Sequence, residues 1–155
     1  MSAHQLTNQV KILHKVAIIA DNQVLLLKRH DLAHSRPSCW DLPGGNAEWP
    51  KQTTMPLLQH LHQADAVREV LEETGIQIEE KQITAPIFFD TYFVAEKKVY
   101  TVVVGWCVNL PTQPKILLSV EHTELTWVSL GSATQFDFGF AGGPDGFIVQ
   151  IINHV

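Results

Sequence analysis

The sequence contains little cysteine, no concentrated positive charge and no long apolar stretch. Its two cysteines, Cys39 and Cys107, lie far apart without metal-ligand spacing, which argues against a disulfide framework and suits a reducing compartment. The formal net charge of −5 and the lack of a basic run argue against a nucleic-acid partner. The apolar runs are too short to cross a membrane, and the first residues lack the apolar core of a signal peptide. We therefore expect a cytoplasmic protein without a membrane partner.

The sequence is rich in apolar residues. They make up 45% of 155 residues, which is enough for one core and too little for two, so one domain over residues 1–155 is expected. Short runs rich in β-branched and aromatic residues predict six strands, the third and fourth joined by the turn Glu96-Lys97-Lys98: 16–20, 24–27, 87–95, 99–108, 116–120 and 125–130. Residues 136–146 predict a glycine-rich loop, and residues 147–155 a short closing helix. The fold class is therefore a mixed α/β fold, a sheet with helices packed on it.

One longer helix is predicted from about Leu57 to Thr74. Apolar residues recur there at helical spacing: Leu57, Leu58, Leu61, Ala64, Val67, Val70 and Leu71. Thr53 or Thr54 could cap its start, Pro56 suits a first turn, and Gly75 suits the C-terminal cap. The last four apolar residues of the helix, Ala64, Val67, Val70 and Leu71, are expected to face the core.

The opposite face of this helix carries a cluster of carboxylates. Glu69, Glu72 and Glu73 lie at i, i+3 and i+4, and like charges at this spacing destabilise an isolated helix by about 0.2–0.5 kcal/mol per pair. The cluster is either a solvated polar face or a site for a hard divalent cation, which prefers carboxylate oxygens. The spacing alone does not decide between the two.

The residues around the cluster resemble the Nudix box, a glycine followed by a spaced glutamate and then R-E-U-x-E-E-x-G-U, with U aliphatic. The matching positions are Gly45, Arg68, Glu69, Val70, Glu72, Glu73, Gly75 and Ile76. The stretch W-x-L-P-G-G at residues 40–45 and the strand around Trp127 extend the resemblance over nearly the whole chain. It implies a Nudix-type alpha/beta/alpha sandwich.

The resemblance also implies a reaction: a Mg²⁺-dependent hydrolase, with Mn²⁺ as an alternative ion, attacks phosphorus with water and cleaves the diphosphate linkage of a nucleoside diphosphate derivative. That small-molecule substrate would be a nucleoside triphosphate, a dinucleoside polyphosphate or a nucleotide sugar. A non-hydrolysing nucleotide-binding or regulatory module of the same fold is the alternative. An isomerase of the isoprenoid type is a third, although neither cysteine has a supporting motif. The oligomeric state is open, and a homodimer is compatible with the sequence.

One feature departs from the family pattern. Twenty-two residues, 46–67, separate Gly45 from Arg68, nine more than the pattern has. The early box glutamate falls on Lys51 or His60, depending on the end from which one counts, and neither is a carboxylate. We expect the extra residues to form a loop leading into an early helix turn and to border the substrate pocket.

The resemblance assigns roles to single residues. It makes Glu69 and Glu73 the principal metal ligands, Glu72 a ligand or support, and the carbonyl of Gly45 a neutral ligand. Arg68 either holds a glutamate by an ion pair, which the resemblance favours, or contacts phosphate.

A glutamate from a distant loop commonly completes such sites. Glu121 is the expected base or metal ligand, and Glu124 is its competitor. His122, between them, is expected to be exposed, and for Asp65 a metal role and a plain helix-surface or capping role stay open.

The substrate residues are less clearly marked. Arg29, at the end of LLLKR, is expected to contact phosphate. Tyr92 resembles a marker of dinucleoside polyphosphate hydrolases that stacks a base, but its place in a strand rich in aromatic residues favours packing in the core. Phe136, Phe138 and Phe140 either wall a base pocket or pack the C-terminal segment.

Overall fold

The computed structural model describes residues 9–51 and 54–155. It contains a six-stranded mixed sheet: β1 (Val10–Ala20), β2 (Gln23–Arg29), β3 (Trp40–Asp41), β4 (Phe88–Val94), β5 (Val99–Asn109) and β6 (His122–Ser129). The strands follow the order β3-β2-β1-β5-β4, and β6 pairs with β2. β1 and β5 run parallel from the pair Val10–Tyr100 to the pair Ile19–Asn109, whereas the other strand pairs are antiparallel. The predicted mixed α/β class is confirmed.

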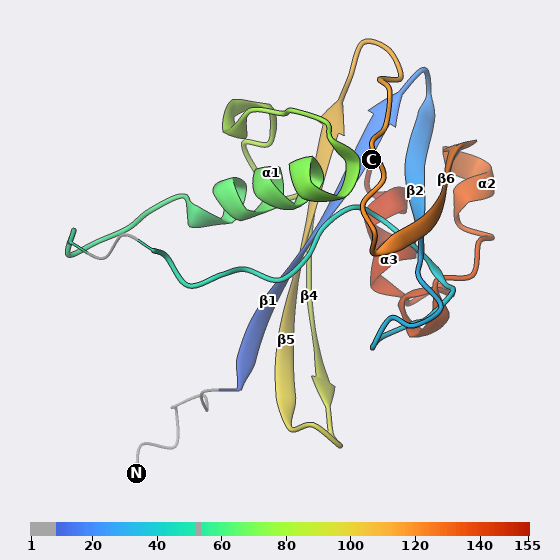
Figure 1. Cartoon of the computed structure of the whole chain (residues 1–155). Helices are drawn as coiled ribbons and strands as arrows, with labels where there is room; N and C mark the ends of the chain where they lie inside the picture. Colours follow the sequence, from blue (N-terminus) through green and yellow to red (C-terminus); the bar gives the residue numbers. More distant parts are fainter. Residues whose placement is uncertain (1–8, 52–53) are drawn as a thin grey trace.

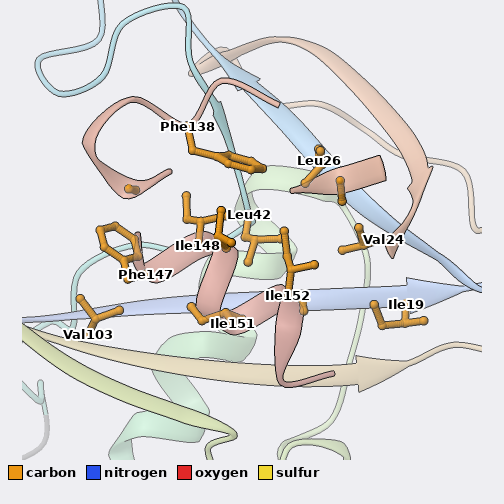
Figure 2. Close-up of a cluster of buried hydrophobic side chains, with 14 residues drawn as sticks. Ile19, Val24, Leu26, Leu42, Val103, Phe138, Phe147, Ile148, Ile151 and Ile152 are labelled. Atoms are coloured by element: carbon orange, nitrogen blue, oxygen red, sulfur yellow. The ribbon is translucent and has the colours of Figure 1, made fainter. Parts of the chain in front are cut away.

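Helices cover both faces of this sheet, α1 (Leu61–Thr74) on one side and α2 (Leu130–Ala133) and α3 (Phe147–Asn153) on the other (Figure 1). Val16 and Ile18 of β1 belong to the core cluster that includes α1, whereas Ala17 and Ile19 belong to the cluster around α3. Figure 2 shows the second cluster. Because both faces of β1 are covered, its sequence is a continuous apolar run rather than an alternating one. The predicted sandwich is confirmed.

The start of the long helix was predicted wrongly. α1 begins at Leu61, after His60 in a left-handed conformation (φ 60°), so Pro56 lies outside it. Leu57 is 66% exposed and has no core to pack against, which explains why the apolar pattern does not extend the helix. His60 makes no capping bond with its side chain, and Thr54 is not the cap; Thr53 lies outside the described residues.

The C-terminal end of α1 follows the prediction, but its buried face does not. Gly75, at φ 72°, donates its N–H to the carbonyl of Leu71 and ends the helix. Leu71 is 44% exposed and Ala64 is also exposed, contrary to expectation. The buried stripe is instead Ala66, Val70 and Glu73, at i, i+4 and i+7, so α1 turns one carboxylate toward the sheet.

Two strand predictions also need correction. Residues 116–120 form no strand, because Leu117 and Ser119 donate their N–H groups to the carbonyls of Thr74 and Glu73 at the end of α1. β1 begins at Val10, well before residue 16, in a stretch that mixes polar and apolar residues. The β4–β5 hairpin and the closing helix, observed as α3, are confirmed. In the part of the chain that the structure describes, no helix combines the length and apolarity that crossing a membrane needs.

Candidate active site

All the residues predicted to act together line one cleft of about 470 Å³: Arg29, Gly45, Arg68, Glu69, Glu72, Glu73, Tyr92 and Glu121. They come from β2, the loop after β3, α1, β4 and the loop before β6. Segments far apart in the sequence therefore meet at one place. The cleft also contains residues that the sequence did not single out, chiefly Lys11, Lys15, Arg36, Glu48 and Phe147.

The glycine turn is held against β1 by backbone hydrogen bonds. Val16 and His14 donate to the carbonyls of Pro43 and Gly45, each at 2.8 Å. The carbonyl of Gly45 is thus already engaged by His14 and offers only its second lone pair to a ligand, which qualifies the expectation of a free metal-facing oxygen. A Cβ on Gly44 (φ 142°) would lie 2.1 Å from the His14 carbonyl oxygen, so this position demands glycine.

Gly45 meets the first carboxylate of the cluster. A Cβ built on Gly45 would lie 2.5 Å from the Glu69 carboxyl carbon, so the absence of a side chain makes room for that carboxylate. Arg68 donates to Glu69 at 2.8 Å and to Glu72 at 3.0 Å, so the predicted ion pair is present. Arg68 also lies 3.5 Å from both Glu48 and Asp65, so four carboxylates surround a single guanidinium. Burial raises the pKa of Glu69, and Arg68 opposes that shift.

Glu73 is the buried member of the cluster. Its Oε2 accepts the N–H of Gly44 at 2.8 Å, which ties α1 to the glycine turn. Burial raises the pKa of Glu73 to about 8, although Lys15 and the Gly44 N–H act in the opposite direction. Without a cation, the site therefore favours a protonated Glu73 near neutral pH.

His122 was predicted to be exposed, and this was wrong. Its side chain is buried, with Nε2 at 3.9 Å from Glu73 Oε1 and Nδ1 at 3.1 Å from Ser119 Oγ. β6 begins at this residue and turns the ring inward, while the neighbouring Glu121 stays exposed. Burial lowers the pKa of His122 to about 4, so the ring is neutral at physiological pH.

The two candidate distant glutamates occupy different places. Glu121 lines the cleft, and its backbone carbonyl accepts the N–H of His30. Glu124 forms an ion pair with Lys28 at 2.7 Å and does not line the cleft. The geometry therefore places Glu121, rather than Glu124, beside the carboxylates of α1.

A buried aspartate that the sequence analysis missed gathers three cations at the cleft. Asp41 Oδ2 lies 2.8 Å from Lys15 Nζ, 3.1 Å from Arg29 and 2.7 Å from Arg36. Although burial would raise the pKa of Asp41, Lys15, Arg36 and Arg29 together lower it to about 2. Arg36 is committed to Asp41 and to the carbonyls of Trp40 and Phe138. Because three cations share one carboxylate, the group carries a net positive charge.

Aromatic rings form one wall of the cleft. Tyr92 stacks on Phe147, with ring centroids 5.8 Å apart and planes inclined by 5°, and Phe140 meets both rings edge-on. Phe140 is 61% exposed and lines the cleft, whereas Phe138 is buried in the core and Phe136 packs against Trp40. Of the three phenylalanines considered from the sequence, only Phe140 is placed to meet a ligand. Phe147 was missed because it belongs to the closing helix.

The carboxylates of α1 are not arranged around a common point as metal ligands would be, in the residues that the structure describes. In residues 9–51 and 54–155, no three His, Cys, Asp or Glu side chains are gathered as a metal-binding group. Glu69 and Glu72 are held by Arg68, and Glu73 by Gly44. A cation would therefore compete with these partners for the carboxylate oxygens.

Comparisons with known proteins give a matching family model and similar folds. A family model described as NUDIX domain matches residues 14–144. The fold is similar to that of a MutT protein from Methanosarcina mazei Go1, with a TM-score of 0.71 and 22% identity over 96% of this chain and 94% of that one. It is also similar to the E. coli dihydroneopterin triphosphate pyrophosphohydrolase, with a TM-score of 0.65 and 21% identity over 92% of each chain.

A third similar structure is part of a longer protein. It is a bifunctional NMN adenylyltransferase/ADP ribose pyrophosphatase from Francisella tularensis, complexed with AMP and a Mn ion. The TM-score is 0.56 and the identity 22%, over 81% of this chain and 35% of that one. A search of curated proteins by sequence finds no match.

Proposed function

Because the chain belongs to the NUDIX domain family, we propose that it is a Mg²⁺-dependent hydrolase that cleaves the diphosphate linkage of a nucleoside diphosphate derivative. Water would attack a phosphorus atom. The family match supports a pyrophosphohydrolase in general, and the cleft supports the finer assignment. The observation that carries it is the convergence of Glu69, Glu72 and Glu73 on one cleft that also holds a cationic group.

The carboxylates fit a hard divalent cation. Glu69 and Glu73 have raised pKa values chiefly because they are buried, so a nearby cation would favour their charged forms. Carboxylate oxygens are the donors that Mg²⁺ and Mn²⁺ prefer. Glu69 and Glu73 would hold the ion, with Glu72, Glu121 and the Gly45 carbonyl as further donors. When bound, such an ion offsets the negative charge of a diphosphate and acidifies water.

The other residues of the cleft would bind and orient the substrate. Arg29 Nη1 donates a hydrogen bond to Asp41, and Arg29 Nε donates one to the Ser35 carbonyl. The remaining N–H groups of the guanidinium are left to bind a phosphate oxygen. Arg68 would hold Glu69 and Glu72 in place. Tyr92, backed by Phe147, offers an aromatic face to a base. Glu121 would accept a proton from the attacking water.

One observation favours a second candidate, a module that binds a nucleotide without hydrolysing it. The positions to which the early box glutamate maps are Lys51 and His60, and His60 lies outside α1 in a left-handed conformation. No carboxylate can reach the site from either position. The three glutamates of α1 argue for catalysis, and a turnover assay decides between the candidates.

The test is a hydrolysis assay over a panel of nucleotides. It should include nucleoside triphosphates, dinucleoside polyphosphates, nucleotide sugars and dihydroneopterin triphosphate, each with Mg²⁺, with Mn²⁺ and with excess EDTA. We expect turnover of at least one compound that requires metal and that Glu69→Gln reduces about a hundredfold or more. Glu80→Gln, an exposed change outside the cleft, is the matched control. Tight binding without turnover would instead support the second candidate.

A further inference from the structure

A second hollow lies beside the cleft and shares lining residues with it. It has a volume of about 530 Å³, and we call it the annex, defined by Lys11, Arg29, His34, Lys97 and Glu121. Lys11, Arg29 and Glu121 line the cleft as well. The two hollows therefore adjoin at these residues, so a ligand in the cleft lies next to the annex.

The annex brings together two lysines, Lys11 and Lys97, that have no carboxylate partner among the described residues. Lys11 lies near the start of β1, and Lys97 lies in the turn that joins β4 to β5, beside the start of β1 in Figure 1. Burial lowers the pKa of Lys11, and the like charges of Lys97 and then Lys15 lower it further. Among the described residues neither Lys11 nor Lys97 takes part in an ion pair, although six other lysine and arginine side chains do so with nearby carboxylates: Lys15, Lys28, Arg29, Arg36, Arg68 and Lys81.

The excess of positive charge is local. The chain as a whole carries a formal net charge of −5, whereas the annex is lined by three lysine or arginine side chains, of which only Arg29 is paired with a carboxylate, and by Glu121 as its one lining carboxylate. Two lysines held close together raise each other's energy unless an anion lies between them. Two lysines without ion pairs in a hollow beside the cleft offer charge complementarity to an anion, in a chain that is acidic as a whole.

We propose that the annex binds the phosphate groups of the substrate that lie beyond the scissile linkage, so that the enzyme selects nucleotides with three or more phosphates over nucleotide sugars. This inference rests on the proposed function, because the rest of the substrate must occupy the cleft. Each added phosphate brings negative charge toward Lys11 and Lys97, whereas the sugar of a nucleotide sugar is neutral and gains nothing from them. Lysine ammonium groups act as point charges and tolerate the varied positions of a flexible phosphate chain.

The test separates anion binding from catalysis. Binding of inorganic tripolyphosphate is measured by calorimetry in EDTA, at low and high salt, for wild type, Lys11→Gln, Lys97→Gln and the double variant. We expect each single change to raise Kd about two- to fivefold and the double change about tenfold, with smaller effects at high salt. Lys115→Gln is the matched control, because Lys115 is exposed and lies outside both hollows.

The same variants are then assayed with substrates. We expect the KM for a nucleoside tri- or tetraphosphate to rise relative to the KM for a nucleotide sugar. Tripolyphosphate affinity that does not depend on Lys11 and Lys97, or equal rises in KM for both substrate types, would overturn the proposal that the annex binds the substrate's phosphates. Failure of the wild-type enzyme to hydrolyse any nucleotide would overturn the proposed function and the substrate class with it, while the calorimetry would still decide whether the annex binds anions.

Discussion

Replacing Gly45 by alanine tests whether the glycine turn positions the first carboxylate. The φ of Gly45 lies outside the left-handed region, so alanine is compatible with the backbone. Its Cβ, however, would lie 2.5 Å from the Glu69 carboxyl carbon, and an ordinary contact begins at 3.4 Å. The carboxylate must therefore retreat by about 1 Å, a movement that a flexible side chain makes at little cost to the fold. A misplacement of about 1 Å can cost a hundredfold in rate, or about 2.7 kcal/mol of transition-state stabilisation.

The assay for this variant compares activity with stability. We expect kcat/KM for the best substrate to fall about a hundredfold, while the free energy of unfolding changes by less than about 1 kcal/mol. Gly131→Ala is the control, since its Cβ meets nothing within 4 Å in α2 and should stabilise the helix slightly. Retention of activity within about threefold by a folded Gly45→Ala enzyme would refute the argument that this turn positions Glu69.

Three further predictions follow from the site. Glu121→Gln should lower kcat more than Glu124→Gln, because only Glu121 lines the cleft. The reverse order in steady-state kinetics would assign the role of base or metal ligand to Glu124 instead. In the metal-free protein, the raised pKa of Glu73 contributes stability that is complete below about pH 4.5 and is lost as the pH rises through about 8. Glu73→Gln should therefore flatten the dependence of the free energy of unfolding on pH in this range, as measured by denaturant titrations. An unchanged pH dependence would contradict the argument that burial raises this pKa. Replacing residues 49–57 by a short glycine-serine link should change KM and substrate preference more than the metal requirement, because Glu48 and Arg68 line both the cleft and the apolar hollow beside this loop. Unaltered kinetics on every substrate would show that the loop has no role in substrate selection.

Local sequence patterns predicted much of the framework of the site. The spacing of Glu69, Glu72 and Glu73 was sufficient to place them on one helix, because helical periodicity depends only on local geometry. Gly75 was likewise recognisable from its position at the end of that helix, whereas Gly45 was identified through the resemblance to the Nudix box. The β4–β5 hairpin was predictable because two β-rich runs flank a short charged turn.

Features that depend on tertiary packing were not predictable in this way. Asp41 is one acidic residue in a short strand, and nothing local shows that Lys15, Arg29 and Arg36 converge on it. His122 lies in a polar stretch that looks solvent-exposed, but strand pairing with β2 turns its ring inward.

The apolar pattern of the long helix was misleading for a related reason. It extends back to Leu57, but a helix stays formed only where its apolar face finds a partner, and Leu57 is exposed while Leu58 is only half-buried.

The central claim is that the carboxylates of α1 bind a divalent cation, and direct measurement of Mn²⁺ affinity tests it. Mn²⁺ binding in the absence of substrate is followed by electron paramagnetic resonance for wild type, Glu69→Gln and Glu73→Gln, with Glu80→Gln as the control. The account predicts saturable binding to wild type and to the control, and affinity at least about tenfold weaker in each α1 variant. Equal Mn²⁺ affinity in all four proteins would contradict it.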